Sequence, residues 1–194
     1  MRDIDIWGTI KPCMNLDRSE PCLAKLKTFN FLELSGYGFR GFIPFDSIRQ
    51  QRAHNDGGIP QSPGVYLVMR ISPDAPRFLA KGFGGTHKAQ KANVPISILE
   101  AKWVPDASVL YFGKASQRKF GGGLWDRVNE YAVAGRGQKH GHRGGEHIWQ
   151  LADAKDLLVA WKVTPGGTEQ QLEGSLIEAF EEHYGKIPFA NRKR

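Results

Sequence analysis

The stretch GVYLVMRI, residues 64–71, carries the clearest local signal in the chain. Val65, Leu67 and Met69 alternate with Tyr66, Val68 and Arg70 in this stretch, and a period of two is typical of a pleated strand with two different faces. A loop-forming run with paired prolines precedes it. The sequence therefore predicts a strand that begins at Gly64 and presents a tyrosine on one face.

Other segments extend this prediction in both directions. Residues 108–113 (SVLYFG) and 156–163 (DLLVAWKV) predict two further strands, and residues 29–45 predict one or two short strands joined by a turn. The segment 72–107 is basic on balance and predicts a surface insertion, with a short strand over RFLAK and a short helix over ISILEAKW.

Two segments have the spacing of amphipathic helices. The first follows Gly121-Gly122-Gly123 and ends at Gly135, with Leu124, Val128, Tyr131 and Ala132 on one face. The second begins at Thr168, which forms a predicted capping box with Gln171, and ends near Gly185. Strands, helix, strand and helix in this order predict an α+β or mixed α/β fold of two or three layers.

Length and charge limit the function. The 194 residues suit one domain with an N-terminal extension. A net charge of +7 favours polyanionic partners, nucleic acid before an acidic membrane surface. The chain has no apolar run long enough for a membrane span and no apolar N-terminal core, so we expect a cytoplasmic protein. Cys13 and Cys22 form no Cys-x-x-Cys pair and are expected to be reduced thiols.

Two charged residues occupy unusual positions on the predicted helices. Glu173 falls near the centre of an apolar stripe on the last helix, where an ionised acid needs a counter-charge, a metal or a cleft open to water. Arg127 lies at the margin of the apolar stripe of the earlier helix. Taken alone, each position favours the alternative of a structural ion pair or a side chain that reaches solvent.

These residues belong to a larger pattern. Gly64-Val65-Tyr66 and Tyr111-Phe112-Gly113-Lys114 resemble the paired half-motifs of the GIY-YIG endonuclease superfamily. A helix with Arg127 and Tyr131, a later helix with Glu173 and the sequence PFAN ending at Asn191 follow in the family's order. The resemblance spans residues 60–191. Val65 and Phe112 stand where the family has isoleucine, a change between apolar residues that packing tolerates.

The resemblance implies a small antiparallel three-stranded sheet flanked by helices. Residues 60–194 would form the nuclease domain, residues 1–59 would be an extension packed on it, and the insertion would separate the two motif strands, which the family usually joins by a short hairpin. Tyr66 and Tyr111 would project side by side, and the helices would bring Arg127 and Glu173 to the same surface.

The resemblance also implies a metal-dependent endonuclease that hydrolyses phosphodiester bonds, with DNA as the first expected substrate. Glu173 would hold one divalent cation, Mg²⁺ or Mn²⁺, and Tyr66 or Tyr111 would accept the proton from water. Arg127 would clamp the scissile phosphate, and Tyr131 would position it. Positive charge from Lys114, Arg127 or the metal would favour the phenolate. Lys114, Lys119 and Arg127 would contact the nucleic acid. Asn191 would order the wall of the site.

Two other functions share this pattern, namely a non-catalytic nucleic-acid-binding module and an RNA endonuclease. His140, His142 and His147 with Glu146 are candidate ligands for zinc or another transition metal, but their glycine-rich segment offers no rigid support for a metal site. The competing interpretation is a loop that contacts phosphate. The glycine-rich run at residues 82–88 lacks the Gly-Lys-Ser/Thr ending of a nucleotide-binding loop, so no nucleotide cofactor is expected.

Overall fold

A computed structural model of the chain describes residues 26–50, 58–87, 90–91, 93–119, 121–138 and 146–192. Cys13, Cys22, His140 and His142 lie outside these residues, so the predictions that involve them are not addressed by the structure. Within the described ranges, no helix combines the length and the apolar character needed to cross a membrane.

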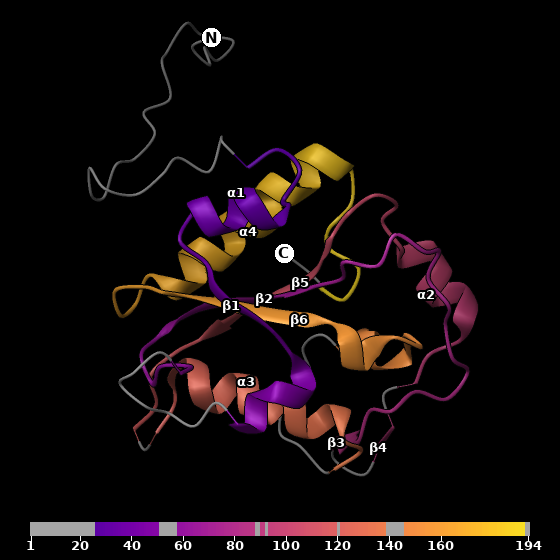
Figure 1. The fold of residues 1–194 in the computed structure, drawn as a ribbon, viewed down its shortest axis with the longest axis horizontal. Coiled ribbons are helices and arrows are strands. Elements are labelled where there is room, and N and C mark those ends of the chain that lie inside the picture. The colour runs from indigo at the N-terminus through magenta and orange to yellow at the C-terminus, as the bar shows by residue number, and fades with distance from the viewer. Residues whose placement is uncertain are drawn as a thin grey trace, which may run out of the picture.

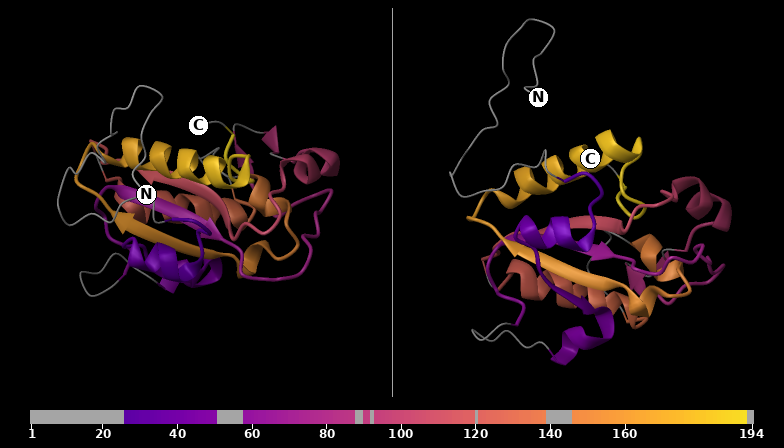
Figure 2. Two further views of the ribbon diagram at one scale, coloured as in Figure 1. Left: turned by 90° about the horizontal axis from the view of Figure 1, so that it is seen from above. Right: turned by 45° about the horizontal axis from the view of Figure 1, so that its top comes forward.

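The described chain forms three layers, with a sheet between two layers of helices (Figure 1). Helices α1 (Phe31–Gly36) and α4 (Glu169–Tyr184) cover one face of the sheet, and α3 (Gly123–Gly135) covers the other. The right-hand view of Figure 2 shows the same arrangement. The mixed α+β prediction is therefore confirmed.

The main sheet has four strands in the described part of the chain, all antiparallel to their neighbours. They are β1 (Arg40–Pro44), β2 (Gly64–Met69), β5 (Val109–Ala115) and β6 (Leu158–Val163), and the spatial order is β1-β6-β2-β5. The prediction of a three-stranded sheet is wrong by one strand, because β1 pairs with the edge of β6 that β2 leaves open.

Gly41 allows this fourth strand to form. It pairs with Ala160 of β6, and a Cβ atom at position 41 would lie 2.2 Å from the Trp161 ring. Its φ of 97° is also a conformation that glycine adopts readily. The strand thus depends on a glycine packed against the Trp161 ring, and residues from the predicted N-terminal extension share one sheet with the motif strands.

The segment 29–45 contains a helix as well as a strand, so its prediction as strands alone is wrong. Asn30 accepts a hydrogen bond from the backbone N–H of Glu33 and caps α1. The Glu33 carboxylate in turn accepts bonds from the backbone N–H groups of Lys27, Thr28 and Phe29. This reciprocal capping satisfies backbone donors that a strand would leave for a neighbour.

The insertion contains the predicted helix but not the predicted strand. Helix α2 (Ile96–Lys102) matches ISILEAKW, and β3 (Thr86–His87) pairs with β4 (Gln90–Lys91) in a short second sheet. Over RFLAK the backbone makes only an isolated bridge, between Phe78 and Leu151. The bridge is formed by backbone hydrogen bonds between residues 77–79 and 150–152, and the buried Gln150 side chain adds bonds to the carbonyls of Leu79 and Val94.

Short 3₁₀ helices complete the fold at η2 (Phe45–Gln50), η3 (Glu146–Gln150) and η4 (Ala154–Asp156). Helix α4 ends at Gly185, which has a φ of 71°, as the sequence predicted. The capping box at its start is absent, since the Thr168 hydroxyl donates to the Pro165 carbonyl and makes no bond to the helix. The prediction of that capping box is wrong because the turn before the helix competes for the hydroxyl.

The two faces of β2 contribute to different cores. Tyr66 and Val68 pack with residues of α3, while Val65, Leu67 and Met69 pack with residues of α1 and α4. Each of these side chains is fully or almost fully buried. Alternate residues of β2 therefore pack into different cores, as the sequence pattern predicted, and Tyr66 lies on the α3 side.

Candidate functional site

Three tyrosines meet on the α3 side of the sheet. Tyr66 comes from β2, Tyr111 from β5 and Tyr131 from α3, and the three ring centroids lie 5.6–6.2 Å apart. Tyr111 is the most accessible of the three, with 6% of its surface exposed. Residues from three separate segments thus form one aromatic cluster, and Tyr111 lies at its outer side.

Gly113 makes room for the Tyr66 ring. It is opposite Tyr66 in the β2–β5 register, and a Cβ atom there would lie 2.6 Å from the Tyr66 hydroxyl oxygen and 2.7 Å from the Tyr111 ring. Both contacts are shorter than packing permits. The glycine of the second half-motif is therefore required for the two tyrosines to lie side by side.

Burial dominates the acidity of the tyrosines. It raises the pKa of Tyr111 to about 12 and the pKa values of Tyr66 and Tyr131 well above 10. A hydrogen bond between the two hydroxyls lowers the pKa of Tyr111 and raises that of Tyr66, the pattern expected when Tyr66 donates to Tyr111. Tyr111 is thus the more easily deprotonated of the two.

Arg127 brings positive charge to this cluster from α3. Its charge lowers the pKa values of Tyr66, Tyr111 and Glu173, although burial outweighs it in each case. The side chain is 27% exposed, and its Nη1 atom lies 3.2 Å from Oε2 of Glu130. Arg127 is therefore a half-buried cation whose charge acts on the tyrosine cluster.

Glu173 approaches the same place from α4, on the other face of the sheet. Its side chain is 20% exposed, and burial raises the pKa of its carboxyl group. The Lys114 ammonium is 4.0 Å from Oε2, and the Lys114 backbone is also a hydrogen-bond partner of the carboxylate. Since Glu173 raises the pKa of Tyr111, the acid and the phenol are electrostatically coupled across the β5 edge.

Glu173 has the properties of a ligand for one hard cation. Its carboxylate is desolvated, and the neighbouring positive charges offset that cost only in part. No group of three or more His, Cys, Asp or Glu residues suited to a metal occurs in the described residues. A single carboxylate beside open solvent suits Mg²⁺, which keeps several water ligands in most protein sites.

Glu169, one turn before Glu173, is a nearby acid that the sequence analysis missed. It is buried, and hydrogen bonds from the Ser116 side chain and from backbone N–H groups, including that of Gly167, lower the pKa of its carboxyl group. Its i, i+4 spacing from Glu173 was the available signal. Hydrogen bonds lower the pKa of Glu169, whereas burial outweighs the Lys114 contacts and raises the pKa of Glu173.

Asn191 lies at the open edge of β5 and is bound to the backbone. Its amide accepts from the Phe112 N–H and donates to the Phe112 carbonyl, both at 3.0 Å. Lys102 donates to the Asn191 carbonyl at 3.1 Å. The asparagine thus acts as a short substitute for a neighbouring strand and holds the segment that carries Tyr111.

The basic residues predicted to contact nucleic acid lie in or after β5. Lys114 is partly exposed and also donates to Gln170 at 2.9 Å, so it links β5 to α4. Lys119 is exposed in the segment that joins β5 to α3. His147 is half-buried near Phe189, and burial and the charge of Lys102 lower its pKa. Glu146, beside it, is partly buried.

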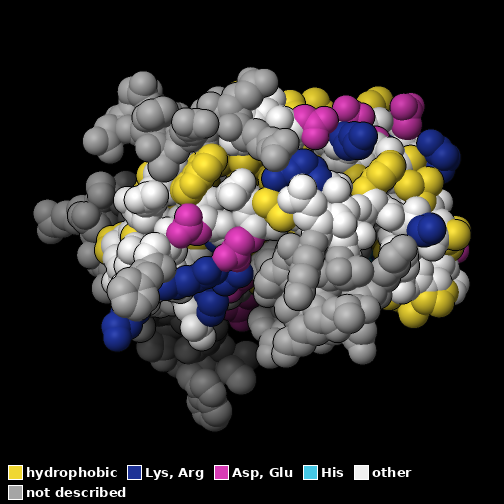
Figure 3. All heavy atoms as spheres, turned by 90° about the horizontal axis from the view of Figure 1, so that it is seen from below, with side chains coloured by type: hydrophobic (Ala, Val, Ile, Leu, Met, Phe, Trp, Pro, Cys, Tyr) yellow, Lys and Arg dark blue, Asp and Glu magenta, His cyan; other side chains and the backbone are white. Residues whose placement is uncertain are grey.

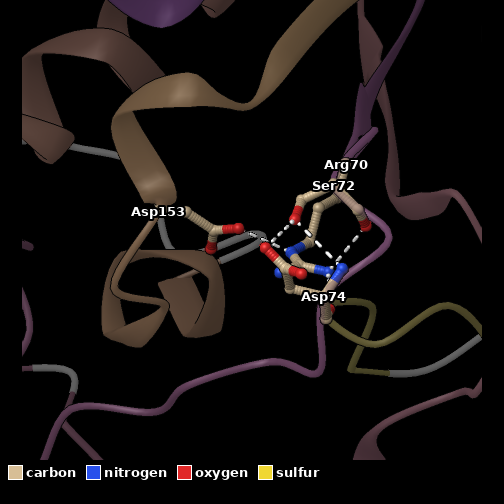
Figure 4. Close-up of polar contacts among 4 residues, drawn as sticks. All are labelled: Arg70, Ser72, Asp74 and Asp153. Carbon is tan, nitrogen blue, oxygen red and sulfur yellow. Dashed lines mark hydrogen bonds and ion pairs between the residues drawn. The ribbon is translucent and has the colours of Figure 1, made fainter.

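A hollow of about 730 Å³ lies at the other end of β2 and has a different character. Arg70 lines it, but its guanidinium group is occupied by Asp153 and by the carbonyls of Ser72 and Asp74, as Figure 4 shows. The side chain is only 8% exposed. This arginine connects the end of β2 to the turn before η4, so we assign it a structural role.

The tyrosine, arginine and glutamate side chains together offer proton-accepting oxygen, fixed positive charge and a desolvated carboxylate within one region. That combination suits a reaction at a phosphate group, in which negative charge accumulates on oxygen. No protein-family model, curated protein or solved structure matches the chain.

Proposed function

We propose that this protein is a metal-dependent endonuclease of the GIY-YIG type that hydrolyses phosphodiester bonds of DNA. The observation that carries the proposal is the convergence of Tyr66, Tyr111, Arg127 and Glu173 from four separate elements at the edge of β5. Their electrostatic influence on one another is what a shared reaction centre requires. The half-motif resemblance supports the same function, and the basic net charge favours a polyanionic substrate.

In this proposal Arg127 binds the scissile phosphate, because its half-buried guanidinium group acts electrostatically on the tyrosines and can neutralise charge on the phosphoryl oxygens. Lys114 supplies a second positive charge beside Glu173. Asn191 positions Tyr111 through the two hydrogen bonds to Phe112 and does not react. Tyr131 packs against both other tyrosines and fixes the orientation of their rings.

Tyr111 is the proton acceptor in this scheme. The attacking water loses a proton to the oxygen of the Tyr111 phenolate as its own oxygen bonds to phosphorus. The bond from phosphorus to the leaving oxygen breaks, and that oxygen takes a proton from solvent water. Tyr66 donates a hydrogen bond that stabilises the Tyr111 phenolate. Glu173 would hold Mg²⁺ or Mn²⁺, which when bound supplies positive charge at the phosphate and an acidified water.

Plasmid nicking tests this function. The wild-type protein is incubated with supercoiled plasmid, single-stranded DNA and RNA, each with Mg²⁺ and with EDTA. We expect nicking of plasmid that requires the metal and is lost in Glu173→Gln. The matched control is Glu178→Gln, an exposed acid on the same helix, which should cleave as the wild type does.

Other outcomes of this experiment would favour an alternative function or contradict the role of Glu173. Binding of DNA without cleavage under any metal condition would favour the non-catalytic module. Metal-dependent cleavage of RNA alone would identify an RNA endonuclease with the same site. Cleavage by Glu173→Gln at the wild-type rate would contradict the assignment of Glu173 as the metal ligand.

A further inference from the structure

Two arginines share one acid on the α3 side of the molecule. Arg118 binds Glu130 through both terminal nitrogens, at 2.8 and 3.2 Å, and Arg127 binds the same carboxylate at 3.2 Å. On this side of the molecule, Figure 3 shows basic and acidic side chains next to one another. The two arginines share the charge of Glu130, and Asp126 is a second acid that acts on Arg118.

A glycine turn places Arg118 over α3. Gly121, Gly122 and Gly123 all have positive φ, of 70°, 104° and 78°. A Cβ atom at Gly122 would lie 2.7 Å from the Arg118 backbone nitrogen, and one at Gly123 would lie 2.0 Å from the Gln61 carbonyl oxygen. Because other residues fit such a turn poorly, the three glycines give Arg118 a defined position beside α3.

The exposed fraction of the side chain decreases from Arg118 through Glu130 to Arg127. Arg118 is 43% exposed, Glu130 31% and Arg127 27%. A guanidinium group has five N–H donors, and the two bonds to Glu130 use two of those of Arg118. Arg118 therefore keeps donors at the surface, next to Arg127, whose charge acts on the tyrosines.

We propose that Arg118 is a second phosphate-binding residue of this site, and that Glu130 positions Arg118 and Arg127 as a pair that grips the nucleic-acid backbone. The inference rests on the proposed nuclease function and adds to it a contact outside the tyrosine cluster. Arginine suits this role because its planar donors match phosphate oxygens in pairs. Contacts of this kind give affinity and register but no base specificity.

Binding measurements in the inactive Glu173→Gln background test Arg118. Fluorescence anisotropy with a labelled DNA duplex, between about 50 and 200 mM salt, should show steep weakening with salt. Arg118→Gln should bind several-fold more weakly, with a log–log salt slope smaller by about one. The matched control is Arg40→Gln, an exposed arginine on β1 at the far edge of the sheet, which should bind like its parent.

Glu130→Gln tests the positioning role by separating turnover from affinity. Without the carboxylate charge the two guanidinium groups repel each other, so kcat should fall by about tenfold. Affinity should stay equal or increase slightly, because a negative charge near the phosphates is gone. Thermal unfolding of the variant shows whether it is folded, and Glu182→Gln, an exposed acid on α4, is the control.

The outcomes distinguish this inference from the nuclease proposal. Equal binding and equal salt slope for Arg118→Gln and its parent would overturn the phosphate contact while leaving the nuclease intact. An unchanged kcat in folded Glu130→Gln would overturn the positioning role. A wild-type protein that binds neither the duplex nor an RNA of the same length would overturn both proposals together.

Discussion

Arg70 and Arg127 are both half- or fully buried arginines, yet their surroundings give them opposite roles. Arg70 is 8% exposed and lies 2.6 Å from Asp153, and it also donates to two backbone carbonyls. Arg127 is 27% exposed and shares its acid with a second arginine. The donors of Arg70 are bound to the fold and stabilise it, whereas Arg127 is more exposed and its charge acts on the neighbouring tyrosines.

Replacing each arginine by methionine should give the largest effects, on stability at position 70 and on cleavage at position 127. Arg70→Met leaves Asp153 without its partner and should lower the free energy of unfolding by about 3–5 kcal/mol, while the folded fraction cleaves normally. Arg127→Met should change stability by about 1 kcal/mol or less and slow cleavage by about 100-fold. Denaturant unfolding and plasmid nicking measure the two effects.

Arg77→Met, a change at an exposed arginine near Arg70, is the control for both measurements. If Arg127→Met unfolded the protein and Arg70→Met abolished nicking in a folded chain, both assignments would be wrong: Arg127 would be the structural arginine and Arg70 the functional one.

The pH dependence of cleavage should sharpen the assignment of Tyr111. Because burial raises its pKa to about 12, the phenolate is scarce at neutral pH and its population grows with pH. The wild-type rate should therefore rise nearly tenfold per unit between about pH 7 and 9. Tyr111→Phe should be about 100-fold slower at pH 8 and lose most of that slope.

The metal-bound water also titrates, so the comparison between the two proteins is the decisive quantity. A Tyr111→Phe protein with the wild-type slope and rate would remove Tyr111 as the proton acceptor. Duplex affinity should be nearly the same in both proteins, since only one hydroxyl group differs.

The smallest expected effect is a difference in stability between variants of the two α4 acids, Glu169 and Glu173. The Glu169 carboxyl has a lowered pKa, so its contribution to stability is present above the ordinary value of 4.5 and is lost as pH falls. Glu169→Gln should thus cost about 1 kcal/mol at pH 7. The Glu173 pKa is raised, so its ionised form destabilises the fold once pH rises above 4.5.

Glu173→Gln without metal should therefore be as stable as the wild type at pH 7 or slightly more stable, and the difference should disappear below about pH 4. Urea unfolding at both pH values gives the comparison. Clear destabilisation by Glu173→Gln at pH 7 would indicate a structural ion pair with Lys114 in place of a ligand site.

The sequence predicted the elements whose patterns are local. The alternation around Tyr66 predicted β2, the spacing of Leu124, Val128 and Tyr131 predicted α3, and Gly185 predicted the end of α4. It failed where hydrogen bonds outside such patterns decide the backbone. At residues 77–81 the chain makes only an isolated bridge to residues 150–152, and the Gln150 amide binds the Leu79 carbonyl beside it. Asn30 with Glu33 caps a helix within a segment rich in strand-forming aromatics.

For the candidate site, too, some features follow from the sequence and others only from the tertiary structure. By itself, the sequence determined which residues are candidates for the chemistry, because the order of two tyrosines, an arginine, a glutamate and an asparagine is a property of the chain. Only the tertiary structure decided that β1 extends the sheet, that burial raises the tyrosine pKa values, and that Arg118 and Arg127 share Glu130. Those outcomes depend on desolvation and on contacts between residues distant in sequence, which no local pattern encodes.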